Sequence, residues 1–266
     1  MLEKTKKIIY EKEIDKINFN NLLERMQNSA ALGRYKLSWR PLLQRYTMNA
    51  LTKEQAVAAI KAYNQGLDRN RRKNIDVDSD ARRAFHTGLG ASFDEIEKQV
   101  RFIGDDYGGV AGMPKALELS GRIAQAILDK RDSFLVAAQN NAPLKDKIPD
   151  RRSIETLFAP FQQDLKLKCG SRRNWLVWAT KFWHFLNVDT FPIMDSFVAD
   201  FTELSSQANS VDKYIKVMRR LHAFIVVRDS WLPAMRSADN GYAWSDLKLW
   251  DKVIYQIGYE KRGNCK

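Results

Sequence analysis

The chain has 266 residues, which is enough for one large domain or two small ones, each with a buried core. Apolar residues make up 44% of it, with 7 Trp, 9 Tyr and 13 Phe, and this excludes a disordered chain. Lys and Arg outnumber Asp and Glu by 44 to 32, giving a net charge of +12. Such an excess is typical of a protein with a polyanionic partner, most often nucleic acid, and a basic surface that serves only solubility is the alternative.

Cysteine and histidine usage gives no sign of a metal or a cofactor. Two cysteines, Cys169 and Cys265, form neither a disulfide framework nor a zinc site, and the 3 histidines share no ligand spacing. The N-terminal stretch MLEKTKKIIYEKE lacks the uninterrupted apolar core of a signal peptide, and no apolar run is long enough to span a membrane. We therefore expect a cytoplasmic protein with no metal, no cofactor and no membrane partner.

The first half of the chain contains two sequence patterns that predict the start of a helix. TKEQ at 52–55 is a capping box, and it predicts a helix that ends at Gly66. SFDE at 92–95 repeats the pattern and predicts a helix that ends at Gly104. IDVDSD at 75–80 is the best candidate for a strand, because its apolar and acidic residues alternate.

Further helices are predicted in the second half of the chain and just before it. Pro114 begins KALELSGRIAQAILDK, where proline suits the first turn of a helix. From Ser210 onward, apolar residues recur at steps of three and four, with basic residues on the opposite face. A last helix, near SDLKLWDKVIYQIG, is expected to close on Gly258. The sequence thus predicts a mostly α protein.

The domain organisation is predicted from one segment. APLKDKIPDRR at 142–152 contains two prolines and several charges, which is typical of a boundary. We expect a two-lobed helical fold with an N-terminal helical lobe at 1–145 and a C-terminal lobe at 146–266. One continuous domain is the alternative.

A cluster of cations lies in DRNRRKN at 68–74. Its basic residues include Arg71, Arg72 and Lys73. A solvated charged loop explains the cluster, and so does a contact to the DNA backbone.

The segment 169–198 contains a polar turn, a strongly apolar helix and the step FPIMD, which ends on Asp195. The turn offers backbone N–H groups and two arginines to a phosphate. A carboxylate placed at a helix start can stabilise a developing cation or position a water. The alternative is that Asp195 only caps the helix at 196–204, which contributes about 1 kcal/mol. The turn consists of Gly170, Ser171, Arg172, Arg173 and Asn174.

The layout of turn, apolar helix, FPIMD and helix over residues 165–201 resembles the helix-hairpin-helix DNA glycosylase superfamily. Those enzymes place a hairpin turn ahead of a P-V-D step, whose aspartate is both helix cap and catalytic carboxylate. The resemblance implies that Asp195 is catalytic and that the turn at 170–174 binds duplex DNA. We also expect a monomer. The turn carries no lysine that could form a Schiff base, so the expected enzyme is monofunctional, with water as nucleophile.

The resemblance also implies a mechanism. The target base leaves the stack, enters an aromatic pocket and is excised to leave an abasic site. The negative charge of Asp195 stabilises the oxocarbenium character that develops on the sugar. Any single aromatic residue is more often core than pocket. The pocket candidates are Trp175, Trp178, Tyr242, Trp244 and Trp250.

Three questions stay open at this level. The excised base is a modified or damaged one; some such glycosylases attack hypermodified (glucosylated hydroxymethyl-) cytosine in phage DNA as antiviral defence, and oxidised or alkylated bases are alternatives. Glu155, Glu203 and Asp251 are equally placed as a second acid. The rival functions are a non-catalytic helical DNA-binding module and a helical interaction protein.

Overall fold

A computed structural model describes residues 48–67, 73–106, 116–139, 141–168, 176–243 and 245–263. All of them belong to the second of the two units into which the chain divides, Tyr46–Lys266. The predicted mostly α fold is confirmed, because these residues form helices, turns and an isolated bridge between Leu67 and Lys73.

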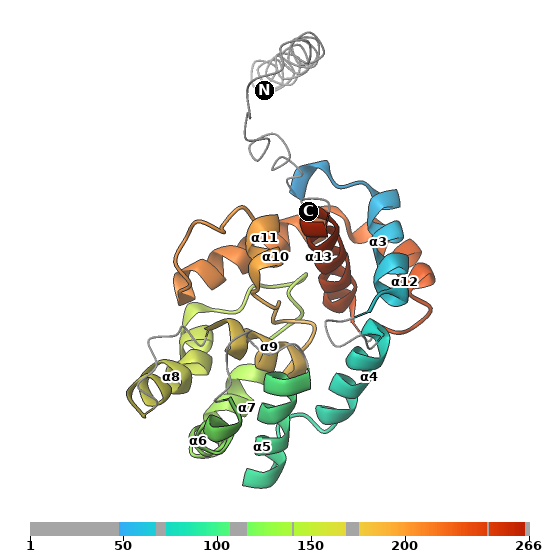
Figure 1. Ribbon diagram of the computed structural model, residues 1–266. Coiled ribbons are helices and arrows are strands. Elements are labelled where there is room, and N and C mark those ends of the chain that lie inside the picture. Colours follow the sequence, from blue (N-terminus) through green and yellow to red (C-terminus); the bar gives the residue numbers. More distant parts are fainter. Residues whose placement is uncertain are drawn as a thin grey trace, which may run out of the picture. The chain divides into compact units, whose positions relative to one another are not determined.

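Helices follow one another along the chain and carry the labels used in Figure 1. In chain order they are the 3₁₀ turn η1 (Met48–Ala50), α3 (Lys53–Gln65), α4 (Asn74–Ala84), α5 (Phe93–Arg101), the π-helical turn η2 (Phe102–Asp106), α6 (Ala116–Leu128), α7 (Arg131–Gln139), α8 (Arg151–Lys168), α9 (Leu176–Leu186), α10 (Ser196–Phe201), α11 (Val211–Val227), the 3₁₀ turn η3 (Asp229–Trp231), α12 (Leu232–Asp239) and α13 (Asp246–Gly263).

Both predicted capping boxes are present. The Thr52 hydroxyl accepts from the Gln55 N–H, and the Gln55 side chain accepts from the Thr52 N–H, which satisfies two free donors at the start of α3. Ser92 and Glu95 exchange the same pair of bonds at the start of α5. The chain continues past Arg101 in the π-helical turn, so the predicted end at Gly104 falls inside η2.

Two predictions about secondary structure are wrong. IDVDSD forms part of α4 rather than a strand, because Val77, Asp78 and Ala81 face the interior at helical spacing. Of the three acids in this pattern, Asp78 is buried against lysines instead of facing water. The last helix does not close on Gly258 but runs on to Gly263. Gly258 serves close packing, since a Cβ at this position would come within 2.3 Å of the Phe197 ring.

The helices pack in an order that differs from their order in the chain. α3 packs against α12 and α13, α10 packs against α13, and α5 packs along α6. Figure 1 shows α3, α12 and α13 grouped together, α5, α6 and α7 grouped apart from them, and α9 between the groups. Helices from both sides of residue 145 thus pack together, as the alternative of one continuous domain requires. The division into two lobes stays a prediction.

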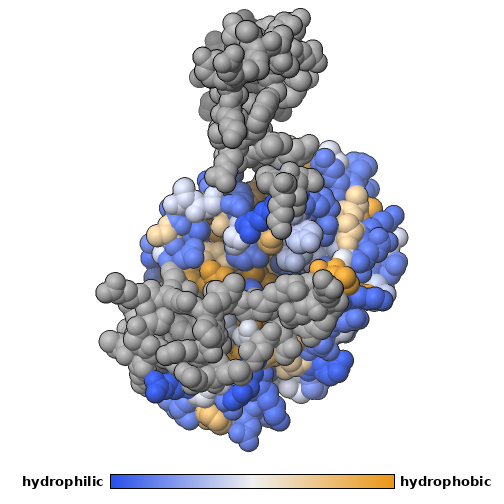
Figure 2. Space-filling model, viewed as in Figure 1, coloured by the Kyte–Doolittle hydropathy of each residue, from blue (hydrophilic) through white to orange (hydrophobic). Residues whose placement is uncertain are grey.

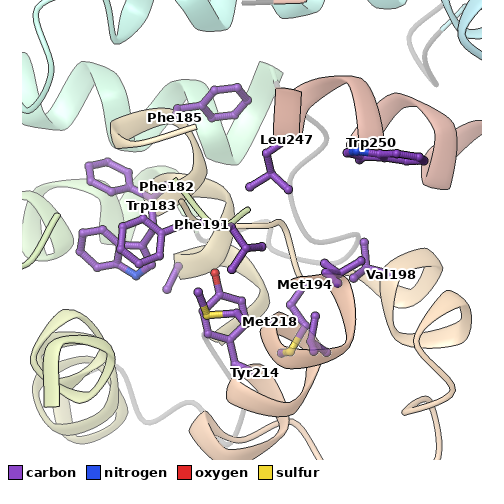
Figure 3. Packing of buried hydrophobic residues seen from close by; sticks show 14 of the residues in the cluster. Phe182, Trp183, Phe185, Phe191, Met194, Val198, Tyr214, Met218, Leu247 and Trp250 are labelled. Carbon is purple, nitrogen blue, oxygen red and sulfur yellow. The ribbon is translucent and has the colours of Figure 1, made fainter. Parts of the chain in front are cut away.

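The core is rich in aromatic residues, and α9 supplies many of them. Trp178, Phe182 and Trp183 are at most 1% exposed and make ring contacts with one another. Figure 3 shows how residues of α9, α11 and α13 converge on Phe191 and Met194, which precede Asp195. In the space-filling view, hydrophobic residues gather in the middle of the visible face, and hydrophilic residues surround them (Figure 2). None of the helices in the described ranges combines the length and the apolar character needed to cross a bilayer.

Candidate active site at Asp195

The FPIM segment, residues 191–194, connects α9 to Asp195 and is buried along its whole length. Side chains from two helices pair with its backbone. His184 Nδ1 lies 2.8 Å from the Phe191 carbonyl, and the Tyr214 hydroxyl donates to the Pro192 carbonyl at 2.9 Å. The Met194 N–H donates to Thr180 Oγ1 at 3.0 Å. Buried backbone groups that are paired in this way do not exchange partners readily, so the segment fixes where Asp195 emerges.

His184 is held neutral in this arrangement. A carbonyl oxygen only accepts, so Nδ1 must carry the proton and Nε2 keeps a lone pair. Burial lowers the pKa of His184 from 6.5 to about 4. Nε2 is buried and has no hydrogen-bond partner among the described residues. The ring therefore supports the FPIM segment without carrying charge at neutral pH.

Asp195 is the N-cap of α10, as predicted. Its backbone is extended, with φ −103° and ψ −171°, and Oδ1 accepts from the Val198 N–H at 2.9 Å. The cap satisfies one of the free N–H groups of the first turn. A carboxylate has about four acceptor positions on its two oxygens, so the cap occupies only part of its capacity.

The charge state of Asp195 is set by several opposing influences. Burial of the carboxylate is the largest, and it raises the pKa of Asp195 above its usual range. The hydrogen bonds from backbone N–H groups and the positive charge of Lys181 lower that pKa, whereas the negative charge of Asp251 raises it further. A carboxyl with a raised pKa takes up a proton more readily than an exposed aspartate, which is the property that a general base needs.

A row of three aromatic residues lies where α13 packs against the start of α10, with one residue from α10 and two from α13. The Phe197 ring lies against Gly258 and 5.3 Å from the ring of Tyr255 in an edge contact. Tyr255 stacks on Tyr259, with 6.2 Å between ring centroids, and Tyr259 is 55% exposed. The Arg262 guanidinium lies 4.2 Å from the Phe197 ring. This aromatic row, Phe197, Tyr255 and Tyr259, leads from the neighbourhood of Asp195 to the surface.

The aromatic row was not predicted from the sequence. Tyr255 and Tyr259 stand four residues apart in the last helix, so their spacing places them on one face. That spacing was visible in the sequence, but nothing local indicates that this face meets α10.

An ion network lies beside the site and joins α13 to its neighbours. It consists of Asp78, Asp239, Lys248, Asp251 and Lys252. Lys248 Nζ is 2.9 Å from Asp78 Oδ1 and 2.8 Å from Asp251 Oδ2. Lys252 Nζ is 2.6 Å from Asp239 Oδ1 and 3.1 Å from Asn64 Oδ1. Both lysines have fully buried side chains, so the network ties α13 to α4, α12 and α3.

The predicted pocket residues fall in different places. Trp178 and Trp250 are 1% and 0% exposed and belong to the hydrophobic core, so they offer no free ring face to a base. Their assignment to a pocket is therefore corrected to a packing role. Tyr242 is 44% exposed, and its ring lies 5.8 Å from Lys252 Nζ. Trp175 and Trp244 lie outside the described residues.

The predicted DNA contacts lie mostly beyond the described ranges. This holds for Arg71 and Arg72 and for the whole turn at 170–174. Lys73 is exposed at the N-cap of α4, where it is accessible to a polyanion. Arg82 and Arg83 are exposed at the other end of the same helix.

The structure separates the three candidate second acids. Glu155 is half exposed on α8 and pairs with Arg151 at 2.7 Å. Glu203 is likewise half exposed and pairs with Arg220 at 3.7 Å. Only Asp251, of these three, belongs to the groups that shift the pKa of Asp195.

Other features add no ligand to the site. Two surface hollows of about 540 Å³ and about 700 Å³ lie beside Pro149 and Asp150, and Asp195 lines neither. Among the described residues, no group of three or more His, Cys, Asp or Glu is placed to hold a metal ion. A scan against protein-family models and searches of curated proteins and of solved structures found no match to this chain.

Proposed function

We propose that the protein is a monofunctional DNA glycosylase, a monomeric and cytoplasmic enzyme that flips a modified or damaged base out of duplex DNA and excises it. The observation that carries this proposal is Asp195, a carboxylate with a raised pKa at the N-cap of α10, held by a buried segment whose backbone is anchored. The sequence resemblance over residues 165–201 and the net charge of +12 support it independently.

The chemistry needs one carboxylate with two duties. Hydrolysis of an N-glycosidic bond develops positive charge on the sugar, and a nearby carboxylate stabilises that charge. The same carboxylate takes a proton from the attacking water, which requires that it ionise before the reaction and accept a proton during it. The burial that raises the pKa of Asp195 suits the second duty, and its negative charge supplies the first.

The base would be read by aromatic stacking. Since Trp178 and Trp250 are core residues, we assign this role to the aromatic row on α10 and α13, together with the predicted Trp175, Tyr242 and Trp244. Aromatic stacking on a flipped or unpaired base contributes about 1–3 kcal/mol per base. Among the substrates, glucosylated hydroxymethylcytosine of phage DNA is the one we test first, beside oxidised and alkylated bases.

The test is to incubate the protein with phage DNA that carries glucosylated hydroxymethylcytosine, with oligonucleotides that carry oxidised or alkylated bases, and with unmodified genomic DNA. Alkali-labile abasic sites are expected on at least one modified substrate. Asp195→Asn should abolish them, because an amide can neither take the proton nor carry the charge. The matched control is Asp200→Asn, which changes an exposed carboxylate on the same short helix.

The rival reading, a non-catalytic DNA-binding module, predicts a different outcome. It requires duplex binding that weakens steeply with salt and no abasic sites on any substrate. A glycosylase should show the same salt dependence, and Asp195→Asn should keep it while losing base release. Absence of abasic sites on every substrate, with salt-dependent binding intact, would favour the rival.

A further inference from the structure

Asp251 is the acid whose surroundings set it apart. It lies on α13, its side chain is 15% exposed, and Oδ2 accepts a charge-assisted hydrogen bond from Lys248 Nζ at 2.8 Å. Lys248 is fully buried and also contacts Asp78 at 2.9 Å. One buried cation thus lies between two carboxylates, and this fixes the position of the Asp251 side chain.

The place of Asp251 relative to Asp195 is set by rigid packing. α13 is held against α10 by the contact of Gly258 with Phe197 and by the Tyr255–Phe197 ring pair. It is held against α4 by the Lys248–Asp78 pair. Asp251 and Tyr255 lie one helical turn apart, so the packing that sets the tyrosine beside Phe197 also directs the carboxylate toward the start of α10.

We propose that Asp251 is a positioning residue of the Asp195 site, a fixed second negative charge that controls when Asp195 holds a proton. The electrostatic part of this inference needs no substrate, whereas its consequence for catalysis rests on the proposed function.

The two carboxylates divide the work because their surroundings differ. Burial opposes the ionisation of Asp251, but the positive charges around it, Lys248 first, outweigh burial and lower its pKa. Asp195 has no such close ion pair within the described part of the chain, and its pKa is raised by burial and by the charge of Asp251. Other groups that act on the pair, among the described residues, are Lys181 and His184 of α9 and Asp78 of α4, whose negative charge interacts with that of Asp251. Two neighbouring acids whose pKa values are pushed apart are a recurrent sign of a divided acid–base role.

In the proposed hydrolysis, the C1′–N bond breaks and its electron pair goes to the base. The water oxygen bonds to C1′, the water gives one proton to Asp195, and the base takes one proton from solvent. Asp251 remains ionised throughout, because Lys248 stays beside it. The negative charge of Asp251 makes the proton transfer to Asp195 more favourable, and it helps to stabilise the positive charge on the sugar.

The first experiment is an NMR titration of the Asp195 carboxyl carbon in the full-length protein labelled with ¹³C-aspartate. Asp195→Asn assigns the signal by its disappearance. In Asp251→Asn, the midpoint of the Asp195 titration is expected to move to lower pH, because a like charge has been removed. In Asp200→Asn, the midpoint should stay where it is. An unchanged midpoint in Asp251→Asn would overturn the proposal.

A titration of the wild-type protein tests the proposal even if Asp251→Asn does not fold. Asp251→Asn leaves Lys248 paired with Asp78, so the variant should fold and show a thermal transition near that of wild type. Whether it folds or not, the wild-type titration must show Asp251 ionising at a lower pH than Asp195, and the Asp195 signal should carry a second inflection as Asp251 titrates. The reverse order would contradict the proposal.

The catalytic consequence is read from pH–rate profiles on a substrate that yields abasic sites. The acidic limb should move to lower pH in Asp251→Asn and return toward wild type in Asp251→Glu, a result that a merely structural role would not give. If the NMR midpoints move but no substrate is cleaved, the proposed function fails and the coupling stands. If a substrate is cleaved with identical profiles and midpoints, the coupling fails and the function stands.

Discussion

Asp78 is a fully buried acid, whereas Asp195 is partly buried at the start of α10, and the two carboxylates have different partners. Asp78 has two buried lysines within 4 Å, Lys248 at 2.9 Å and Lys252 at 3.9 Å. Asp195 accepts from a backbone N–H at 2.9 Å, and the cation that acts on it is Lys181. Burial raises the pKa of both carboxyls, and at Asp78 the positive charges of Lys248 and Lys252 act against that rise. The Asp78 carboxylate serves the fold as a partner in buried ion pairs. Asp195 is held mainly by backbone N–H groups, so its carboxyl is available for a reaction in which its charge state changes.

The largest expected effect comes from removing the buried lysine that pairs with Asp78. Lys248→Met leaves Asp78 and Asp251 without their shared cation inside the protein. Removing one partner of a buried ion pair costs about 3–5 kcal/mol, and we expect a loss of that size in the free energy of unfolding, measured by urea denaturation. Arg151→Ala breaks exposed pairs with Glu155 and Asp212 and should cost below about 1 kcal/mol. Equal losses in the two variants would contradict the distinction.

The second effect concerns His184, the neutral support of the FPIM segment. Its pKa falls from 6.5 in the unfolded chain to about 4 in the folded protein, so the folded state binds the proton less tightly. The stability that this difference contributes is complete above pH 6.5 and is lost as pH falls toward 4, by about 3 kcal/mol. His184→Gln keeps an amide donor but cannot take the proton, so its unfolding free energy should fall less over the same pH range. Parallel pH profiles for variant and wild type would contradict this account.

The third effect tests the anchoring of the segment before Asp195. Tyr214→Phe removes the hydroxyl that donates to the buried Pro192 carbonyl. An unpaired buried acceptor costs about 1–3 kcal/mol, which urea denaturation would detect. Tyr259→Phe changes a 55% exposed tyrosine on α13 and is the matched control, with no measurable change expected. If both variants were as stable as wild type, the hydroxyl would contribute nothing to the segment.

The smallest effect is expected at Asp195, where substitution changes how the free energy of unfolding depends on pH. Because the pKa of Asp195 is raised, its bound proton stabilises the folded state below the unfolded value of 3.8, and this contribution is lost as pH rises through the folded pKa. Asp195→Asn keeps a good N-cap and stays neutral, so it should be more stable than wild type at neutral pH, and the difference should vanish in acid. Asp195→Ala also loses the cap, which costs about 1 kcal/mol. A difference between Asn and wild type that does not vary with pH would contradict the raised pKa.

The parts of the fold that could be predicted from sequence are the local ones. The capping boxes at Thr52 and Ser92 depend on residues three positions apart, so the sequence carries the whole signal. The same holds for Asp195 as the cap of α10 and for the apolar character of α9. These predictions were accurate because each depends only on residues that are close together in the chain.

The failures all involve partners that are distant in the chain. IDVDSD resembled a strand because its apolar and acidic residues alternate, and nothing near Asp78 in the sequence shows that two lysines of α13 lie against it. Gly258 appeared to end a helix because its contact with Phe197 comes from another element. Trp250 resembled a pocket wall for the same reason, since a pattern of aromatic residues does not distinguish a ring in the core from one beside a cavity.

The pairing of α3 with α13 has a consequence for the order in which the protein completes its fold. Lys252 and Asn64 are in contact although 188 residues separate them, and Asp78 also meets its lysines only through α13. During synthesis, Asp195 and the helix that it caps leave the ribosome before α13, which contains Asp251, Tyr255 and Gly258. The surroundings of Asp195 are therefore incomplete until α13 docks, and a chain cut before residue 246 would lack both Asp251 and the aromatic rings of Tyr255 and Tyr259.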